Sequence, residues 1–353
     1  NYQTKKGDVL LNIVGSVGGI GLVFFDIKKC NLTENASKIT SLNKLNPETI
    51  FTYLLSKYGQ NQIHREKVGT VQEKLGLERI RRFKIPIFDQ SFQDKIRDKI
   101  DLSYRKQDQS KKLYKEAEEL FLLELGLLDF KPKNSLTFSA TKKEIIEAQR
   151  FDSEYFEPKY YDIIERIEKY SGGWDYVKNQ FDQNTSLIKN NKDFYNYIEI
   201  GDINISNGDI GYTKLDKSEL PANGKRKLNF GDLLVSKVRP YRGAVSFVDF
   251  QANDLVGSGA FTVLQEKDSY KKEVLMIFLK TSFIKELLLR YNCGTSYPVI
   301  KDADILNLKI PLIKESIQKK IAEKIQQSHL LRKESKELLE KAKKMVEDEI
   351  EKS

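Results

Sequence analysis

A stretch near the start of this sequence recurs far along the chain, and this repeat constrains the fold more than any other feature. Gly7-Asp8-Val9-Leu10-Leu11 returns as Gly231-Asp232-Leu233-Leu234-Val235, at an offset of 224 residues (231 − 7 = 224). Matches in one order along both stretches predict two copies of one structural unit. At offset 224 Ala36 also matches Ala260, and Ile39 matches Val263. A one-residue insertion then changes the offset to 225. The matches at this offset are Gly69-Thr70 with Gly294-Thr295, Lys84-Ile85-Pro86-Ile87 with Lys309-Ile310-Pro311-Leu312, Gln93, Ile96 and Ile100 with Gln318, Ile321 and Ile325, and Leu113 and Ala117 with Leu338 and Ala342.

The two copies are unequal in length. Residues 138–224, which include Arg150-Phe151-Asp152-Ser153-Glu154-Tyr155-Phe156, have no counterpart in the first copy. The first copy therefore lacks its opening portion. The sequence predicts the order partial unit, long helix, complete unit, long helix.

Each copy is expected to have a mixed α/β fold. Short apolar runs bounded by Gly, Lys and Asn turns predict strands, and a helix is expected to follow them. An Ile-Pro pair then marks the entry to a long helix. The predicted strands are 9–14, 21–25 and 37–40 in the first copy and 232–237, 244–247 and 261–264 in the second, and the helices are 47–58 and 272–291.

Two stretches without Pro or Gly, residues 89–125 and 315–349, predict long helices. Their apolar and small residues recur at spacings of three and four, which favours an antiparallel coiled-coil pair joining the copies. At 1.5 Å per residue, some 36 residues span about 54 Å, the length of roughly 16 base pairs of B-DNA. The expected seam residues are Ile96, Ile100, Ser103, Gln107, Ser110, Leu113, Ala117 and Leu120 in the first helix, and Ile317, Ile321, Ile325, Ser328, Leu331, Ser335, Leu338, Ala342 and Met345 in the second.

The composition narrows the class of protein. The chain of 353 residues carries a net charge of +9, which suits a polyanionic partner, although a lysine-rich protein without one would look the same. Cys30 and Cys293 are too few for a disulfide framework and favour a reducing cytoplasm. No apolar run approaches the roughly 20 residues that cross a bilayer. His64 and His329 have no Cys or carboxylate in a metal-binding or nucleophile pattern, so we expect both at the surface and expect no metal or cofactor.

The repeated motifs resemble the specificity subunit of a Type I restriction-modification system. The resemblance is carried by Phe230-Gly231-Asp232-Leu233-Leu234, by Gly294-Thr295-Ser296-Tyr297-Pro298, and by Ile310-Pro311-Leu312 through Gln318-Lys319-Lys320-Ile321-Ala322, with Arg150 to Tyr155 as the entry to a unit. It implies a partial first target-recognition domain (1–88), a spacer helix (89–126), a second target-recognition domain (138–312) and a second spacer helix (315–351). Such a subunit performs no catalysis.

The resemblance also implies partners: double-stranded DNA with a bipartite site, two methyltransferase subunits, and through them a restriction subunit. The missing part of the first domain lies outside this sequence or is supplied by another chain, for example by self-association. Two alternatives stay open. The chain could be the recognition region of a single-chain restriction-methyltransferase whose catalytic domains precede residue 1, or a coiled-coil scaffold that binds only protein.

Three stretches of the second copy are candidates for DNA contact, because Lys and Arg bind phosphates while Arg and hydroxyl side chains read base edges. In the first copy the second stretch is replaced by the glycine cluster of residues 15–19, which lacks the Gly-Lys-Ser/Thr ending of a P-loop. Because the loops differ, the two half-sites should differ and the target should be asymmetric. The candidates are Lys225, Arg226 and Lys227; Lys237, Arg239, Tyr241 and Arg242; and Thr295, Ser296 and Tyr297.

Overall fold

The computed structural model describes residues 3–26, 30–40, 44–189, 191–267, 269–294 and 296–352. The chain divides into two compact units. Unit 1 comprises Asn1–Ser110 and Leu330–Ser353, and unit 2 comprises Lys111–His329, so each long helix contributes to both. The predicted mixed α/β class with two long helices is confirmed. No helix in the described part of the chain is long and apolar enough to cross a membrane.

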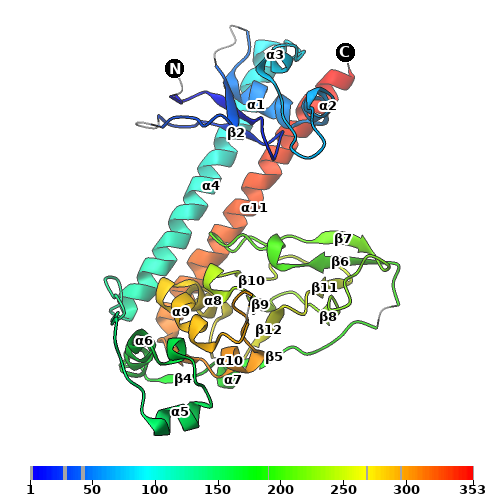
Figure 1. Ribbon diagram of the computed structural model, residues 1–353. Coiled ribbons are helices and arrows are strands. Elements are labelled where there is room, and N and C mark those ends of the chain that lie inside the picture. Colours follow the sequence, from blue (N-terminus) through cyan, green and yellow to red (C-terminus); the bar gives the residue numbers. More distant parts are fainter. Residues whose placement is uncertain are drawn as a thin grey trace. The chain divides into compact units, whose positions relative to one another are not determined.

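Unit 1 is built on a three-stranded antiparallel sheet in the order β2-β1-β3 (Figure 1). The central strand places Val9 on its buried face, where Ile50 and Leu54 of α1 cover it. Asn46 caps α1 by accepting the backbone N–H of Thr49 at 2.8 Å. The elements are β1 (Val9–Asn12), β2 (Ile20–Leu22), β3 (Ala36–Ile39), α1 (Pro47–Leu55), α2 (Lys57–Glu66) and α3 (Leu77–Ile80).

Unit 2 contains sheets in the orders β10-β9-β12-β5, β7-β6-β11-β8 and β13-β4. Its main core lies between the first of these sheets and α8, whose residues from Glu273 to Leu279 are all buried. The strands are β4 (Trp174–Tyr176), β5 (Phe181–Gln183), β6 (Phe194–Ile198), β7 (Thr213–Asp216), β8 (Arg226–Lys227), β9 (Leu233–Ser236), β10 (Val245–Phe247), β11 (Leu255–Gly257), β12 (Phe261–Glu266) and β13 (Lys309–Pro311). The helices are α5 (Lys142–Ala148), α6 (Pro158–Glu168), α7 (Val177–Gln180), α8 (Lys272–Lys280), α9 (Ser282–Leu287) and α10 (Asp302–Leu306), with short 3-10 turns η1 (Ser153–Phe156), η2 (Ile200–Asp202), η3 (Pro240–Arg242) and η4 (Leu288–Tyr291).

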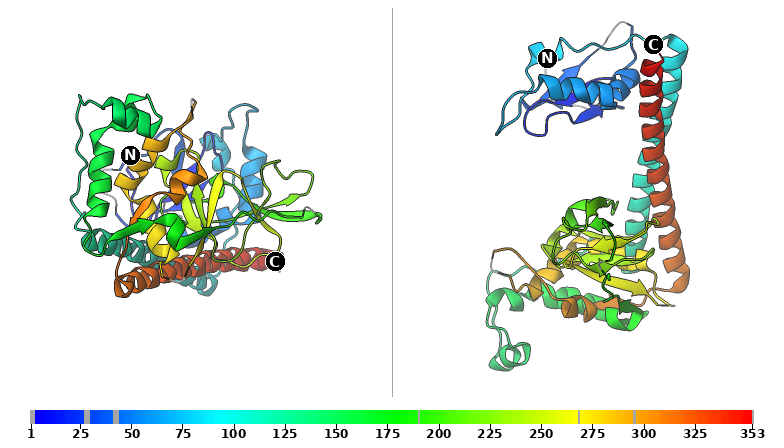
Figure 2. Two further views of the ribbon diagram at one scale, coloured as in Figure 1. Left: turned by 90° about the horizontal axis from the view of Figure 1, so that it is seen from below. Right: turned by 90° about the vertical axis from the view of Figure 1, so that its right-hand side faces the viewer.

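The long helices α4 (Gln90–Glu124) and α11 (Glu315–Glu351) lie side by side and antiparallel within each unit (Figures 1 and 2). In unit 1 the hydroxyl groups of Ser103 and Ser335 are 3.0 Å apart, so the small seam residues do allow close approach. In unit 2 Ala117 and Phe121 of α4 share a core with Ile321 and Ile325 of α11.

Part of the predicted α4 seam is wrong. Gln107 is exposed, and the residues buried beyond Ser110 are Tyr114, Ala117 and Phe121. The buried positions keep the three-four alternation of a heptad. Tyr114 and Phe121 thus take the seam positions predicted for their neighbours Leu113 and Leu120, and both leucines are only half-buried.

A buried glutamine fixes the start of each long helix to its unit. In unit 1 the side-chain amide of Gln93 donates to the carbonyl oxygens of Lys44 (2.9 Å) and Phe88 (3.0 Å). Its amide oxygen accepts the backbone N–H of Asn46 at 2.8 Å. Gln93 is only 3% exposed, so these bonds form away from water. The helix start is therefore joined directly to the residues that begin α1.

The same bonds recur in unit 2 at an offset of 225 (318 − 93 = 225). Gln318 donates to the carbonyl oxygens of Ser269 (3.2 Å) and Ile313 (2.9 Å), and accepts the backbone N–H of Lys271 at 2.9 Å. Each partner occupies the position equivalent to its partner in unit 1. The two copies therefore share this anchoring arrangement, which we call the glutamine clamp.

Strand pairing corrects the alignment of the copies. Leu11 pairs with Ile20, and its equivalent Val235 pairs with Val245, so the offset is 224 before the turn and 225 after it. Because Asn12 pairs with Ala36 and Ser236 with Phe261, Ala36 matches Phe261 and not Ala260. By the same register Ile39 matches Leu264 and not Val263. The inserted residue thus lies in the loop between the first two strands.

The prediction of a single helix in each copy is also wrong. In each unit the helix is divided in two, and the breaks lie at equivalent positions. Ser56 separates α1 from α2, and its hydroxyl donates to the carbonyl oxygen of Tyr53 at 2.6 Å. Thr281 separates α8 from α9 and makes the equivalent bond to Phe278 at 2.7 Å. A hydroxyl side chain that bonds to its own helix offers the backbone an alternative to continuing the helix.

The clamp gives a stability prediction for Gln318→Leu. The substitution replaces the polar amide by an apolar group of similar size and leaves buried backbone groups without partners, which costs about 1–3 kcal/mol each. We expect urea unfolding, followed by fluorescence of Trp174 in unit 2, to show a loss of at least this size. Gln327→Leu, at an exposed position of the same helix, is the control. Equal unfolding midpoints for the two variants would contradict the role of the clamp.

Candidate nucleic-acid interface

The connection from β9 to β10 holds an arginine in an unusual backbone conformation. Arg239 has φ = 49°, in the left-handed region that residues other than glycine avoid at a cost of about 1–2 kcal/mol. The equivalent residue of unit 1 is Gly15, with φ = 75°. Each residue donates its backbone N–H to an equivalent carbonyl, Arg239 to Pro298 at 2.8 Å and Gly15 to Glu73 at 3.2 Å. The shared framework imposes the conformation, and unit 2 places an arginine there.

The loop around Arg239 lies against the turn that contains Tyr297. Val238 and Val299 form an isolated antiparallel bridge between the two segments. The Arg239 guanidinium lies 5.3 Å from the centre of the Tyr297 ring, within the range of a cation–π contact. The structure therefore brings together two stretches that the sequence predicted as separate candidates.

A cleft of about 420 Å³ opens beside this contact. Arg239, Arg242 and Tyr297 contribute its polar side chains. Neither guanidinium forms an ion pair with any residue that the structure describes, and no carboxylate lines the cleft. The cleft thus offers two positive charges and an aromatic edge above an apolar wall formed by Ile200, Ile203, Ile205, Val238 and Ala244.

The entry motif of unit 2 supports the Tyr297 turn from behind. Arg150 donates to the carbonyl oxygen of Asn292 at 2.9 Å and forms a two-bond ion pair with Asp152. This ion pair raises the pKa of the Arg150 guanidinium. The side-chain oxygen of Asn292 then accepts the backbone N–H groups of Gly294 (2.8 Å) and Val299 (3.0 Å). The turn is therefore held by the side chain of Asn292 and by an arginine 142 residues earlier in the chain (292 − 150 = 142).

Lys237 is placed differently from its neighbours. Its ammonium group lies 3.0 Å from the carboxylate of Asp302, and its side chain is 18% exposed. Burial opposes ionisation of Asp302, but hydrogen bonds from Thr262 and Lys237 outweigh it and lower the pKa of the carboxyl group. The positive charge of Lys237 is thus paired with a carboxylate within unit 2.

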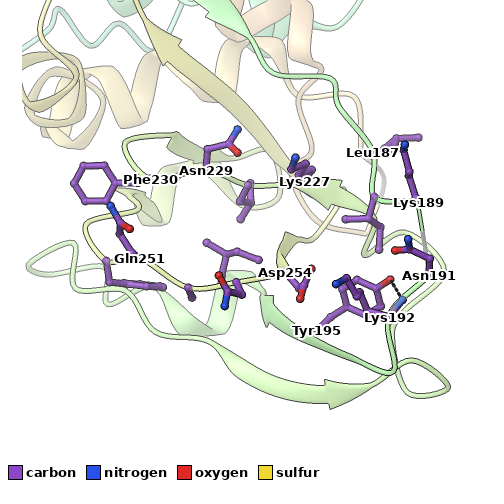
Figure 3. A pocket seen from close by; sticks show the side chains of 16 residues that line it. Leu187, Lys189, Asn191, Lys192, Tyr195, Lys227, Asn229, Phe230, Gln251 and Asp254 are labelled. Atoms are coloured by element: carbon purple, nitrogen blue, oxygen red, sulfur yellow. Dashed lines mark hydrogen bonds between the residues drawn. The ribbon is translucent and has the colours of Figure 1, made fainter.

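A second polar surface surrounds Lys227 (Figure 3). It is a pocket of about 840 Å³ beside β6, β8 and β11. Lys189, Lys192 and Lys227 supply three positive charges and Asp254 one carboxylate, and none of the three lysines is within ion-pair distance of a described carboxylate. The pocket also presents amide groups, which can donate to and accept from base edges. These are Asn191, Asn229, Gln251 and Asn253, with the 62% exposed ring of Phe230 beside them.

Sequence reasoning missed most of this second surface. Lys189, Asn191 and Lys192 fall in a lysine- and asparagine-rich run that has no counterpart in the first copy. That run could have indicated a polyanion contact. Lys225 and Arg226 adjoin Lys227 but do not line the pocket.

The remaining candidates lie near the first cleft in sequence. Tyr241 is 39% exposed, and Ser296 is exposed. Neither lines the cleft. Thr295 lies outside the described residues.

The expectation that both histidines lie at the surface is wrong for His329. Its side chain is 5% exposed, its Nδ1 lies 2.8 Å from a carboxylate oxygen of Asp249, and its ring stacks on Phe247 at 4.8 Å. The contact could not be predicted from the sequence, because Asp249 and His329 are 80 residues apart (329 − 249 = 80). His64, on α2, is exposed as expected. Within the described ranges, no group of three His, Cys, Asp or Glu side chains could hold a metal ion.

The family model for the Type I restriction modification DNA specificity domain matches residues 1–119 and 176–341, which together make up more than half of the chain. This chain belongs to the Type I restriction-modification specificity family. The resemblance inferred from the repeated motifs is therefore confirmed. Specificity subunits of these systems recognise DNA and are not the catalytic components.

Three solved structures resemble the chain loosely. The Type I S subunit from M. genitalium is 13% identical, with 98% of this chain and 83% of that one covered and a TM-score of 0.48. A structure described as the basis of complex assembly and conformational transition of the type I R-M system is 16% identical. The match covers 97% of this chain and 81% of that one, with a TM-score of 0.33. The HsdS subunit from Thermoanaerobacter tengcongensis is 15% identical. The match covers 98% of this chain and 80% of that one, with a TM-score of 0.32. A comparison with curated proteins gives no match.

The left-handed position gives a second stability prediction. Arg239→Gly removes the backbone strain and loses only the contact with Tyr297, so we expect its unfolding free energy to stay within about 1 kcal/mol of the parent. Arg239→Val adds a β-branched side chain at the same φ and should lose about 1–2 kcal/mol relative to Arg239→Gly. Thermal unfolding by circular dichroism compares them. If Val is tolerated as well as Gly, the backbone is not held left-handed.

Proposed function

We propose that this chain recognises a bipartite, asymmetric DNA site, with unit 2 reading one half-site and unit 1 the other, and that it docks methyltransferase subunits. The single observation that supports this most is the contrast between framework and loop. The two units share strand pairing, helix breaks and the glutamine clamp. They differ in the loop that in unit 2 carries Arg239 and Arg242.

The Arg239–Tyr297 cleft is the proposed base-reading site of unit 2. An arginine can donate two hydrogen bonds to O6 and N7 of guanine, which is the commonest specific contact in the major groove. The lysine-rich pocket of Figure 3 would supply phosphate contacts, which position a protein without reading sequence. The corresponding loop of unit 1, Gly15-Ser16-Val17-Gly18, has no charged side chain and would read a different half-site.

The long helices are the proposed spacer between the half-sites. With 35 and 37 residues they measure about 52–56 Å, or roughly 16 base pairs. The partners that we propose from membership of the family are duplex DNA, two methyltransferase subunits and a restriction subunit. The proposed place of action is the cytoplasm.

Substitution of the cleft arginines tests the recognition site. We expect Arg239→Ala and Arg242→Ala each to weaken binding of one half-site, or relax its sequence preference, by about 1–3 kcal/mol. Arg239→Gly should have the same effect without backbone strain. The measurement is fluorescence anisotropy on duplexes selected by mapping methylated sites genome-wide in the presence of the methyltransferase.

The control for these variants is Lys143→Ala, which removes one positive charge from a side chain of α5 that is 81% exposed. It should leave half-site preference intact. If the arginine variants keep the affinity and preference of the parent, the cleft does not read DNA. Failure of the parent to bind any duplex in a salt-dependent way would contradict the proposed function as a whole.

The spacer role predicts the effect of a longer rod. Insertion of seven residues into each long helix preserves the heptad and adds about 10.5 Å, equivalent to roughly three base pairs. We expect the preferred spacing between half-sites to increase by about this amount, as measured by methylation of duplexes with graded spacers. A single-helix insertion, which breaks the pairing, serves as the control. Unchanged spacing would exclude the helices as the ruler.

A further inference from the structure

The lysine-rich pocket of Figure 3 has one carboxylate among its described lining residues, that of Asp254. Phosphate binding does not account for this group, because a carboxylate repels phosphate and weakens its attraction to the lysines. The carboxylate is also not neutralised within the protein. It forms no ion pair and accepts no hydrogen bond from any residue that the structure describes. An exposed, unpaired carboxylate thus shares the pocket with three unpaired ammonium groups.

The backbone turn at Asp254 does not depend on this carboxylate either. Asp254 has φ = 51°, in the left-handed region that Asp and Asn adopt more readily than most residues. Aspartates in turns commonly accept a nearby backbone N–H, as Asp232 does from Asn229 at 2.9 Å. At Asp254 a residue of β6 holds the turn instead. Asn196 donates its backbone N–H to the carbonyl oxygen of Asp254 (3.1 Å) and its side-chain amide to that of Asn253 (2.8 Å). The backbone is therefore fixed, while the carboxylate stays available to a ligand.

Three amide side chains of the same pocket are available in the same way. Asn229, Gln251 and Asn253 make no side-chain hydrogen bond to any residue in the described ranges. Amides and carboxylates can read base edges, whereas ammonium groups bind phosphates. The pocket therefore combines both kinds of group that a sequence-reading site uses.

We propose that Asp254 is a second base-reading residue of unit 2, whose carboxylate accepts a hydrogen bond from the exocyclic amino group of cytosine or adenine in the major groove. Guanine or thymine on the same strand would present an oxygen atom in that place, which a carboxylate repels. Asp254 thus selects an amino base by attraction and rejects the inverted base pair by repulsion. The lysines of the pocket bind the adjacent phosphates. This inference rests on the proposed recognition of DNA and extends it to a second site.

The site at Asp254 reads a base pair different from the one read by Arg239. Strand β6 lies between the two sites. Tyr195, near the start of β6, lines the lysine-rich pocket, and Ile200, just beyond its end, lines the cleft beside Arg239. An extended strand rises about 3.3 Å per residue, so Tyr195 and Ile198 alone are about 10 Å apart, the length of roughly three base pairs. Substitutions at Arg239 and Asp254 should therefore affect different positions of one half-site.

Replacement of Asp254 by asparagine tests the inference in the full polypeptide. Asn tolerates the left-handed backbone and has the same size, but it can donate as well as accept, so it can also bind the oxygen of guanine or thymine. Affinity is measured by fluorescence anisotropy on the preferred half-site and on duplexes in which each base pair is replaced in turn by the other three. For Asp254→Asn we expect the penalty for inverting one base pair to fall about tenfold. The preferred pair at that position shows whether the amino group belongs to cytosine or adenine.

Three further variants serve as controls. Asp193→Asn removes the same charge from an exposed side chain outside the pocket and should leave every penalty unchanged. Lys192→Gln should weaken binding of all duplexes alike and reduce the salt slope by about one. Arg239→Gly should relax preference at another position than Asp254→Asn does. Circular dichroism confirms that each variant folds.

Two results would overturn the inference while leaving the proposed function intact. One is that Asp254→Asn keeps all the penalties of the parent, as the Asp193 control does. The other is that it weakens binding of every duplex by the same factor, which would limit Asp254 to a structural role. If the parent binds no duplex in a salt-dependent way, the inference and the proposed function both fail.

Discussion

The glutamine clamp is the interaction on which the rest of the architecture depends. A long helix can leave a small domain in many directions, and apolar contacts alone do not select one. Gln93 and Gln318 each join a helix start to three fixed backbone groups inside a core that excludes water. Because unpaired amides cost free energy there, the two bonds that each glutamine makes to residues 47–49 positions away favour the observed direction of the helix. The recurrence of these bonds gives each unit the same junction with its helix.

The clamp also explains why the loops can differ so much. The framework of each unit is held by bonds that do not involve the loop after its first strand: the clamp, the hydroxyl breaks at Ser56 and Thr281, and the strand registers. The framework fixes the backbone conformation of the loop only at its two ends. In unit 1 the loop begins at Gly15 and ends at Gly18, and in unit 2 it begins at Arg239 and ends at Gly243, all with positive φ. Between these points the residues are free to change.

The sequence predicted features with a local physical cause and missed those that depend on distant contacts. The strands and long helices follow from turn residues, apolar runs and the lack of Pro and Gly, and each lies within a few residues of its predicted position. The helix break at Thr281 was missed because a single hydroxyl decides it. The approach of Arg239 to Tyr297 could not be predicted, since a bridge between segments about 60 residues apart creates it. The contact of His329 with Asp249 was missed for the same reason.

The left-handed position at Arg239 has a consequence for how such readers diversify. At the equivalent Gly15 a side chain would meet open space, with nothing within 4 Å of an added Cβ atom. The site therefore admits any residue for which the strain of about 1–2 kcal/mol is tolerable, without repacking of the core. The residues of a loop bounded in this way can be substituted without a change in the surrounding framework. Under the recognition proposed above, substitutions confined to this loop would change the DNA preference while the framework stays the same, and the stability margin of the domain decides which residues the loop can carry.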